Sequence, residues 1–98
     1  MSLSTGSVHQ IRVIPPKIVS QSDAVLQVSS CEKRLVQGVY RYRCELNDGQ
    51  QSIWALFATQ CTSDFDNRHI IVGSIIRIRS IIRTEKEGVG LYVNINFS

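Results

Sequence analysis

The chain has 98 residues, of which 43% are hydrophobic and 19% are charged. This length accommodates one domain, and the apolar fraction is too high for a disordered segment. Eleven lysines and arginines against eight acidic residues give a formal net charge of +3, which favours an acidic partner over a basic one. We therefore expect a single globular domain over residues 1–98.

Three cysteines, at Cys31, Cys44 and Cys61, show no CxxC spacing. An odd number without metal-ligand spacing argues against a disulfide framework and against a zinc site. We interpret them as reduced thiols packed as small hydrophobic side chains. No stretch approaches the ~20 apolar residues that cross a membrane, and Met1 to Gln10 lacks the pattern of a signal peptide. We expect a soluble cytosolic or nuclear protein without metal or cofactor.

The N-terminal segment predicts a short helix. Val8 and Ile11 within residues 4–13, and Ile14 directly after them, recur at three-residue spacing, and Ser4 or Thr5 supplies the cap. The helix ends before two prolines, because proline lacks the N–H that would continue it. Residues 17–23 then read as a connector.

The middle of the chain predicts strands with one clear alternation. Tyr40 and Tyr42 point to one side of their strand, and Arg41 and Arg43 point to the other. An Asp-Gly pair supplies the positive φ of a tight hairpin turn. The expected order is strand 24–31, a loop over 32–39 with Gly38 as its hinge, strand 40–46, turn 47–50 and strand 51–57.

The remainder predicts a second hairpin. Residues 58–65 form a short helix or irregular link, and Gly73 marks a bulge or bend near the start of strand 71–83. A turn over 85–88 leads to strand 91–97. In strand 71–83 we expect one face to carry Ile76, Ile78, Ser80 and Ile82.

Five strands with a helical link between the third and the fourth follow the order of an all-β OB-fold barrel. The alternative is a small SH3-like barrel, which usually lacks that link. We favour the OB-fold.

Arginines within strands are the most informative feature for function. Arg41 and Arg43 stand two residues apart, so they project on one face. Neighbouring guanidinium groups repel, and arginine binds a shared carboxylate or phosphate through paired hydrogen bonds. We predict a basic groove that also contains Lys33, Arg34, Arg83 and Lys86. The alternative, strongest for Arg77 and Arg79, is that strand arginines are solvated exterior residues.

Aromatic residues decide between two kinds of ligand. Trp54 and Tyr92 are expected to be exposed and able to stack on unpaired bases, whereas Tyr40 and Tyr42 are expected in the core. The aromatic content is only 7%, which favours a peptide over nucleic acid. Enzyme motifs such as a P-loop, GxSxG or HExxH are missing, so we expect a protein that is not an enzyme.

Several motifs resemble one family. The Arg41-Tyr42-Arg43 strand, the Asn47-Asp48-Gly49 turn and the Ala58-Thr59-Gln60 segment are similar to the N-terminal OB domain of the large subunit of replication protein A. Leu3-Ser4-Thr5-Gly6, Val25-Leu26-Gln27-Val28 and Lys86-Glu87-Gly88 extend the resemblance over nearly the whole chain. The resemblance implies a domain excised from a longer, multi-OB nuclear protein, either replication protein A or a telomere-associated paralogue.

In that family the domain recruits acidic amphipathic segments of checkpoint and repair proteins to a basic cleft, and it binds single-stranded DNA weakly. The resemblance implies the same for replication, repair, checkpoint or telomerase-associated partners and for other subunits of such a complex. It places the cleft at Arg41, Arg43, Lys86 and either Lys33 or Arg34. We expect the apolar side of a bound helix to contact Phe57 and Leu91.

Two further hypotheses stay open. The same surface could bind single-stranded DNA or RNA directly, in which case affinity would fall steeply with salt. Alternatively, the domain could be purely structural and dock on other subunits through strand 71–83.

Overall fold

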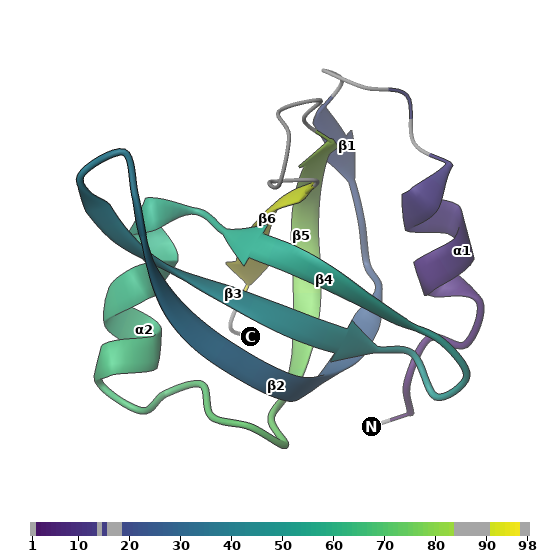
Figure 1. The fold of residues 1–98 in the computed structure, drawn as a ribbon. Helices are drawn as coiled ribbons and strands as arrows, with labels where there is room; N and C mark the ends of the chain where they lie inside the picture. Colours follow the sequence, from purple (N-terminus) through teal and green to yellow (C-terminus); the bar gives the residue numbers. More distant parts are fainter. Residues whose placement is uncertain (1, 14, 16–18, 84–90, 97–98) are drawn as a thin grey trace.

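The computed structural model describes residues 2–13, 15 and 19–83, and the backbone of 91–96 (Figure 1). The elements in chain order are α1 (Ser7–Arg12), β1 (Val19–Gln21), β2 (Val25–Val36), β3 (Val39–Asn47), β4 (Ser52–Phe57), the 3₁₀-helix η1 (Thr59–Cys61), α2 (Thr62–Asp66), β5 (Ile75–Arg83) and β6 (Leu91–Asn96). No helix within these ranges has the length and apolar character that crossing a bilayer requires. The predicted turn 85–88 lies outside the described residues.

The sheet closes on itself and confirms the predicted OB-fold. β2, β3 and β4 form an antiparallel meander, and β5 pairs with β2 in antiparallel fashion. β6 closes the barrel, because it pairs in parallel with β4 and antiparallel with β5. The five predicted strands correspond to β2–β6, and the helical link corresponds to η1 and α2.

The connector expected over 17–23 is partly wrong, because Val19–Gln21 forms β1. β5 is long enough to pair with β2 at Ile75–Arg77 and with β1 at Ser80–Ile82. The backbone of 19–21 therefore gains hydrogen bonds on the same edge of β5 that β2 uses farther along.

The core fills the barrel and extends under both helices. Phe57, Leu26 and Ile78 are among its fully buried side chains, while Phe65 of α2 packs edge-on against Phe57 with ring centroids 5.0 Å apart. Val8 and Ile11 anchor α1 to the same cluster. The helical periodicity at the N-terminus therefore located the packing face of α1 correctly.

The cap of α1 differs from the prediction. Gly6 occupies the N-cap position, and the side chain that satisfies the helix N-terminus is Asp48 from the β3–β4 turn. Asp48 Oδ2 accepts hydrogen bonds from the N–H groups of Gly6 and Val8 at 3.0 and 3.1 Å. Its other oxygen, Oδ1, accepts two more at 2.8 Å each from Gln50 and Gln51. One fully buried carboxylate thus holds both the turn and the helix.

The loop expected over 32–39 is wrong, because β2 and β3 form one long hairpin. β2 continues to Val36, and only Gln37 and Gly38 lie at the turn, with φ of 52° and 81°. Two consecutive positive φ values are the geometry of a two-residue hairpin turn. Lys33 and Arg34 are consequently strand residues with defined faces.

A bulge also changes the faces predicted for strand 71–83. The register between β5 and β6 shifts between Ile78 and Ser80, so one residue is inserted in β5. Beyond the bulge, Ile81 points into the core, and Ser80 and Ile82 are only half-buried. The expected face with Ser80 and Ile82 is therefore wrong past Ile78.

Candidate partner-binding face

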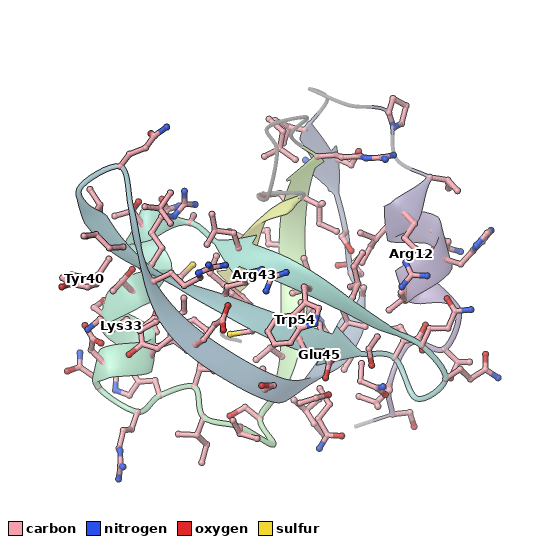
Figure 2. All side chains as sticks on the ribbon, viewed as in Figure 1. Arg12, Lys33, Tyr40, Arg43, Glu45 and Trp54 are labelled. Atoms are coloured by element: carbon pink, nitrogen blue, oxygen red, sulfur yellow. The ribbon has the colours of Figure 1, made fainter. Side chains whose placement is uncertain are left out.

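The exterior of the meander carries a cluster of charged side chains around one tryptophan. Glu32 on β2 lies opposite Arg43 on β3, and Glu45 on β3 lies opposite Trp54 on β4. Directly opposed residues project on the same side of a sheet. We call the surface formed by Glu32, Arg34, Arg43, Glu45 and Trp54 the outer face; Figure 2 labels Arg43, Glu45 and Trp54 on it.

Arg43 is the centre of the outer face. Its Nη1 lies 3.3 Å from Glu32 Oε1, and its guanidinium lies 4.6 Å from the centroid of the Trp54 ring. The guanidinium therefore combines an ion pair with a cation–π contact. The side chain keeps 30% of its surface exposed, so an external ligand can reach it.

Glu32 is shared between two cations. Arg34 Nη1 lies 3.5 Å from the same Oε1 atom that Arg43 contacts. Two positive charges thus meet one negative charge at this point of the outer face. Such a shared carboxylate leaves capacity for a second anion at the two guanidinium groups.

Arg12 borders the outer face and was missed by the sequence reasoning. Its Nη2 donates to the carbonyl oxygen of Ser52 at the start of β4, at 2.7 Å, and its side chain is drawn beside β4 in Figure 2. Arg83 Nη1 in turn donates to the Arg12 carbonyl at 3.0 Å. Arg83 therefore lies at the α1 end of the barrel. The sequence feature that could have drawn attention to Arg12 is its position as a basic residue in the last turn of the predicted helix.

Two residues predicted for the groove are buried instead. Arg41 is 8% exposed, and its Nε donates to the Phe57 carbonyl at 3.0 Å, because its side chain folds over the end of β4. The Phe57 side chain is fully buried in the core. Arg41 and Phe57 therefore do not line an open groove as predicted, and the two arginines that meet at one carboxylate are Arg34 and Arg43.

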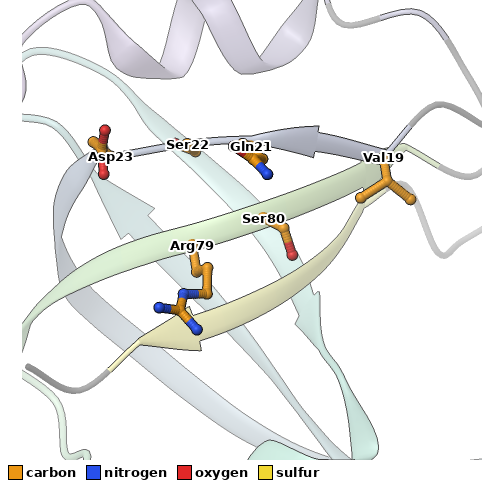
Figure 3. A pocket seen from close by; sticks show the side chains of 6 residues that line it. All are labelled: Val19, Gln21, Ser22, Asp23, Arg79 and Ser80. Carbon is orange, nitrogen blue, oxygen red and sulfur yellow. The ribbon is translucent and has the colours of Figure 1, made fainter.

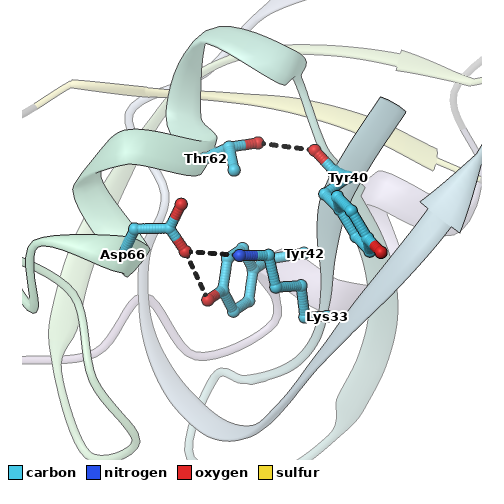
Figure 4. A network of polar contacts seen from close by, with 5 residues as sticks. All are labelled: Lys33, Tyr40, Tyr42, Thr62 and Asp66. Atoms are coloured by element: carbon cyan, nitrogen blue, oxygen red, sulfur yellow. Dashed lines mark hydrogen bonds and ion pairs between the residues drawn. The ribbon is translucent and has the colours of Figure 1, made fainter. Parts of the chain in front are cut away.

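Lys33 was also expected in the groove but lies on the opposite side of the hairpin. It is opposite Tyr42 in the register, on the side that faces α2. Its Nζ lies 2.9 Å from Asp66 Oδ1, and the Tyr42 hydroxyl donates to the same oxygen at 2.8 Å (Figure 4). We call Lys33, Tyr42 and Asp66 the α2-side network.

The α2-side network is electrostatically matched. The hydrogen bonds from Lys33 and Tyr42 lower the pKa of Asp66, and the bond to Asp66 raises the pKa of both donors. Tyr42 also stacks on Phe65 with centroids 4.5 Å apart. Tyr40, expected in the core, is 56% exposed near the hairpin end, and its carbonyl accepts from the Thr62 hydroxyl.

The remaining predicted site residues cannot be placed on the outer face. Lys86 lies outside the described residues, as does the side chain of Leu91. An open pocket lies elsewhere, over β1 and β5, where Arg79 at the bulge and Asp23 are among the lining residues (Figure 3). It carries both signs of charge and is separate from the outer face.

Comparison with known protein families supports the fold and indicates the family to which the chain is similar. The family model of the replication factor-A protein 1 N-terminal domain matches residues 3–89. This range covers α1, the whole meander and β5. A search of curated proteins found no match.

Proposed function

Because the chain belongs to the family of the replication factor-A protein 1 N-terminal domain, we propose that its outer face recruits acidic amphipathic segments of partner proteins. The family match supports a domain of a replication factor-A type complex that binds single-stranded DNA, and a nuclear location is part of the proposal. The partners we propose are proteins of DNA replication, repair, checkpoint signalling or telomere maintenance.

The observation that carries the proposal is the sharing of Glu32 by Arg34 and Arg43. An incoming carboxylate can pair with either guanidinium without displacing a fully matched partner. Charge-assisted hydrogen bonds of this kind are stronger than neutral ones. An acidic side chain on a partner helix therefore finds an incompletely neutralised pair of cations.

The ring of Trp54 supplies the apolar part of the same contact. It is half-buried and is covered by Arg43 on one side. An amphipathic helix presents acidic and apolar side chains one turn apart, so a carboxylate at Arg43 brings an apolar neighbour to Trp54. The outer face therefore suits a ligand with both characters.

The test compares two alanine variants with the same change in net charge. Arg43→Ala removes a cation from the outer face, and Lys33→Ala removes one from the α2-side network. We expect Arg43→Ala to weaken binding of an acidic helical peptide about five- to tenfold, because it also leaves Glu32 less neutralised. Lys33→Ala should change affinity by less than about twofold. Fluorescence anisotropy with a labelled peptide measures both.

Circular dichroism and thermal unfolding serve as the fold controls for the two variants. Equal losses in affinity would show that the peptide senses only overall charge. A loss confined to Lys33→Ala would move the binding surface to the α2 side. Either result would overturn the proposal.

Direct binding of single-stranded DNA is the second candidate, and Trp54 is the observation that favours it. Among the side chains the structure describes, Trp54 is the aromatic residue on the outer face, so it offers a stacking platform for one base. The chain contains one tryptophan, which makes its fluorescence a local reporter. We expect quenching by oligothymidylate with a Kd of about 100 μM at physiological salt. Submicromolar binding would make DNA the main ligand.

A further inference from the structure

Two cysteines face each other across the β2–β3 hairpin. Cys31 is the register partner of Cys44, and the Cys44 thiol donates to Cys31 Sγ across 3.0 Å. They lie 13 positions apart in the chain, so their spacing gives no sign of this contact. Cys61, the third cysteine, is buried in η1.

The geometry of this pair is compatible with a covalent bond. Directly opposed residues of an antiparallel pair have Cα atoms roughly 4.5–5.5 Å apart, and disulfides span Cα separations of roughly 4.4–6.8 Å. The two sulfur atoms must approach by about 1 Å to reach bonding distance. Small side-chain rotations can supply that movement while the strands stay paired.

We propose that Cys31 and Cys44 are an oxidative modification site that forms a reversible cross-strand disulfide, with a low-molecular-weight disulfide such as oxidised glutathione as the oxidant. The inference does not rest on the proposed function. It departs from the interpretation of the three cysteines as reduced thiols that only pack as small hydrophobic side chains.

The reaction proceeds through two exchanges. The Cys31 thiolate, which is the more accessible of the two, attacks one sulfur of oxidised glutathione and releases one glutathione thiolate. The Cys44 thiolate then attacks Cys31 Sγ and releases the second. Two protein thiols lose two electrons and two protons, and one glutathione disulfide becomes two glutathione thiols.

The surroundings make this exchange slow and selective. Burial raises the pKa of both Cys31 and Cys44, so few thiolates are present at neutral pH. The neighbouring sulfur favours closure of the pair over a lasting glutathione adduct at Cys31. The disulfide would form one register step from the Glu32–Arg43 ion pair, within the same hairpin.

The test uses the folded, unmodified chain. Samples equilibrated at increasing ratios of oxidised to reduced glutathione are quenched in acid and alkylated with N-ethylmaleimide in denaturant. Intact mass should shift from three adducts to one as the ratio rises. Peptide mapping needs cleavage at Lys33 and Arg43 and also at Asp48, because trypsin alone leaves Cys44 and Cys61 in one peptide.

We expect the peptides that contain Cys31 and Cys44 to be joined and the single adduct to lie on Cys61. The Cys61→Ala variant should keep the link, and Cys31→Ala should abolish it. The denatured chain should instead give mixed pairings. Three adducts at every ratio, a link to Cys61, or a glutathione adduct that persists on Cys31 would each overturn the proposal. The mapping on unmodified protein stands if a variant fails to fold.

Discussion

The two sides of the β2–β3 hairpin balance their charges differently. On the α2 side, Lys33 and the Tyr42 hydroxyl meet the single carboxylate Asp66, with one positive and one negative charge. On the outer face, the two positive charges of Arg34 and Arg43 share the single carboxylate Glu32, and Glu45 lies opposite Trp54 on the same face. The side chains of Lys33 and Asp66 are each 42% exposed, which resembles the outer-face groups.

This contrast teaches that exposure alone does not distinguish a binding surface from a structural ion pair. Both sides present solvated charges on the same two strands. The difference lies in stoichiometry, because a matched pair gains little from an added anion and a shared carboxylate leaves room for one. Counting the charge of each residue separately does not distinguish a one-to-one ion pair from a carboxylate that two arginines share.

The largest effect is expected from a substitution that destabilises the whole fold, and with it both sides of the hairpin. Asp48→Ala deletes a buried carboxylate that accepts four backbone hydrogen bonds, so we expect a loss of about 3 kcal/mol in the free energy of unfolding. Urea denaturation measures this loss. Asp23→Ala, the same change at an exposed position, should cost less than about 0.5 kcal/mol.

The pH dependence of this effect has a definite sign. Four backbone N–H groups lower the pKa of Asp48 from 3.8 to about 2. A depressed pKa in the folded state adds stability above the unfolded value, and that stability is lost as the pH falls from about 4 towards 2. The difference between the native chain and Asp48→Ala should therefore shrink over this range. A constant difference would contradict the assigned hydrogen bonds.

A smaller change would sharpen the contrast. Glu32→Gln removes the carboxylate that occupies Arg34 and Arg43, so acidic peptide should bind about two- to fivefold more tightly. Glu45→Gln is the matched control, because it makes the same charge change on the outer face, opposite Trp54. Peptide anisotropy should show a smaller gain for Glu45→Gln. Equal gains would reduce the role of Glu32 to general repulsion.

The smallest effect is expected on the α2 side. Asp66→Asn should leave peptide affinity unchanged and lower the urea midpoint slightly, because the ion pair is solvated. It should also return the pKa of Tyr42 towards its ordinary value, since the carboxylate that accepts the hydrogen bond from its hydroxyl is gone. Ultraviolet titration of the tyrosines, with Tyr42→Phe to assign the signal, measures this shift. A changed peptide affinity would break the distinction between the two sides.

Most of the fold could be predicted from the sequence, because side chains of different character alternate along its strands and its turns contain glycine. Residues 40–46 and 51–57 fell almost fully within β3 and β4, and the link over 58–65 matched η1 and α2 closely. These segments have strong local patterns. The resemblance to the replication protein A domain pointed to the same barrel, and the family match agrees with it.

The site was harder to predict, because faces depend on register. The charged run from Glu32 to Arg34 is typical of a loop. The sequence therefore does not show on which side of the sheet Lys33 and Arg34 lie, and both are predicted in one groove with Arg41. One inserted residue at a bulge also reverses the alternation that follows it, as it does before Ile81. The burial of Arg41 depends on a carbonyl at the end of another strand, which no local pattern encodes.

The parallel pairing of β6 with β4 has a consequence for solubility. β6 covers one edge of β4 and one edge of β5 at the same time. If β6 detached, both edges would present unsatisfied backbone donors and acceptors, which recruit strands from other molecules. Holding this one short strand in place therefore protects the domain from aggregation at two edges at once.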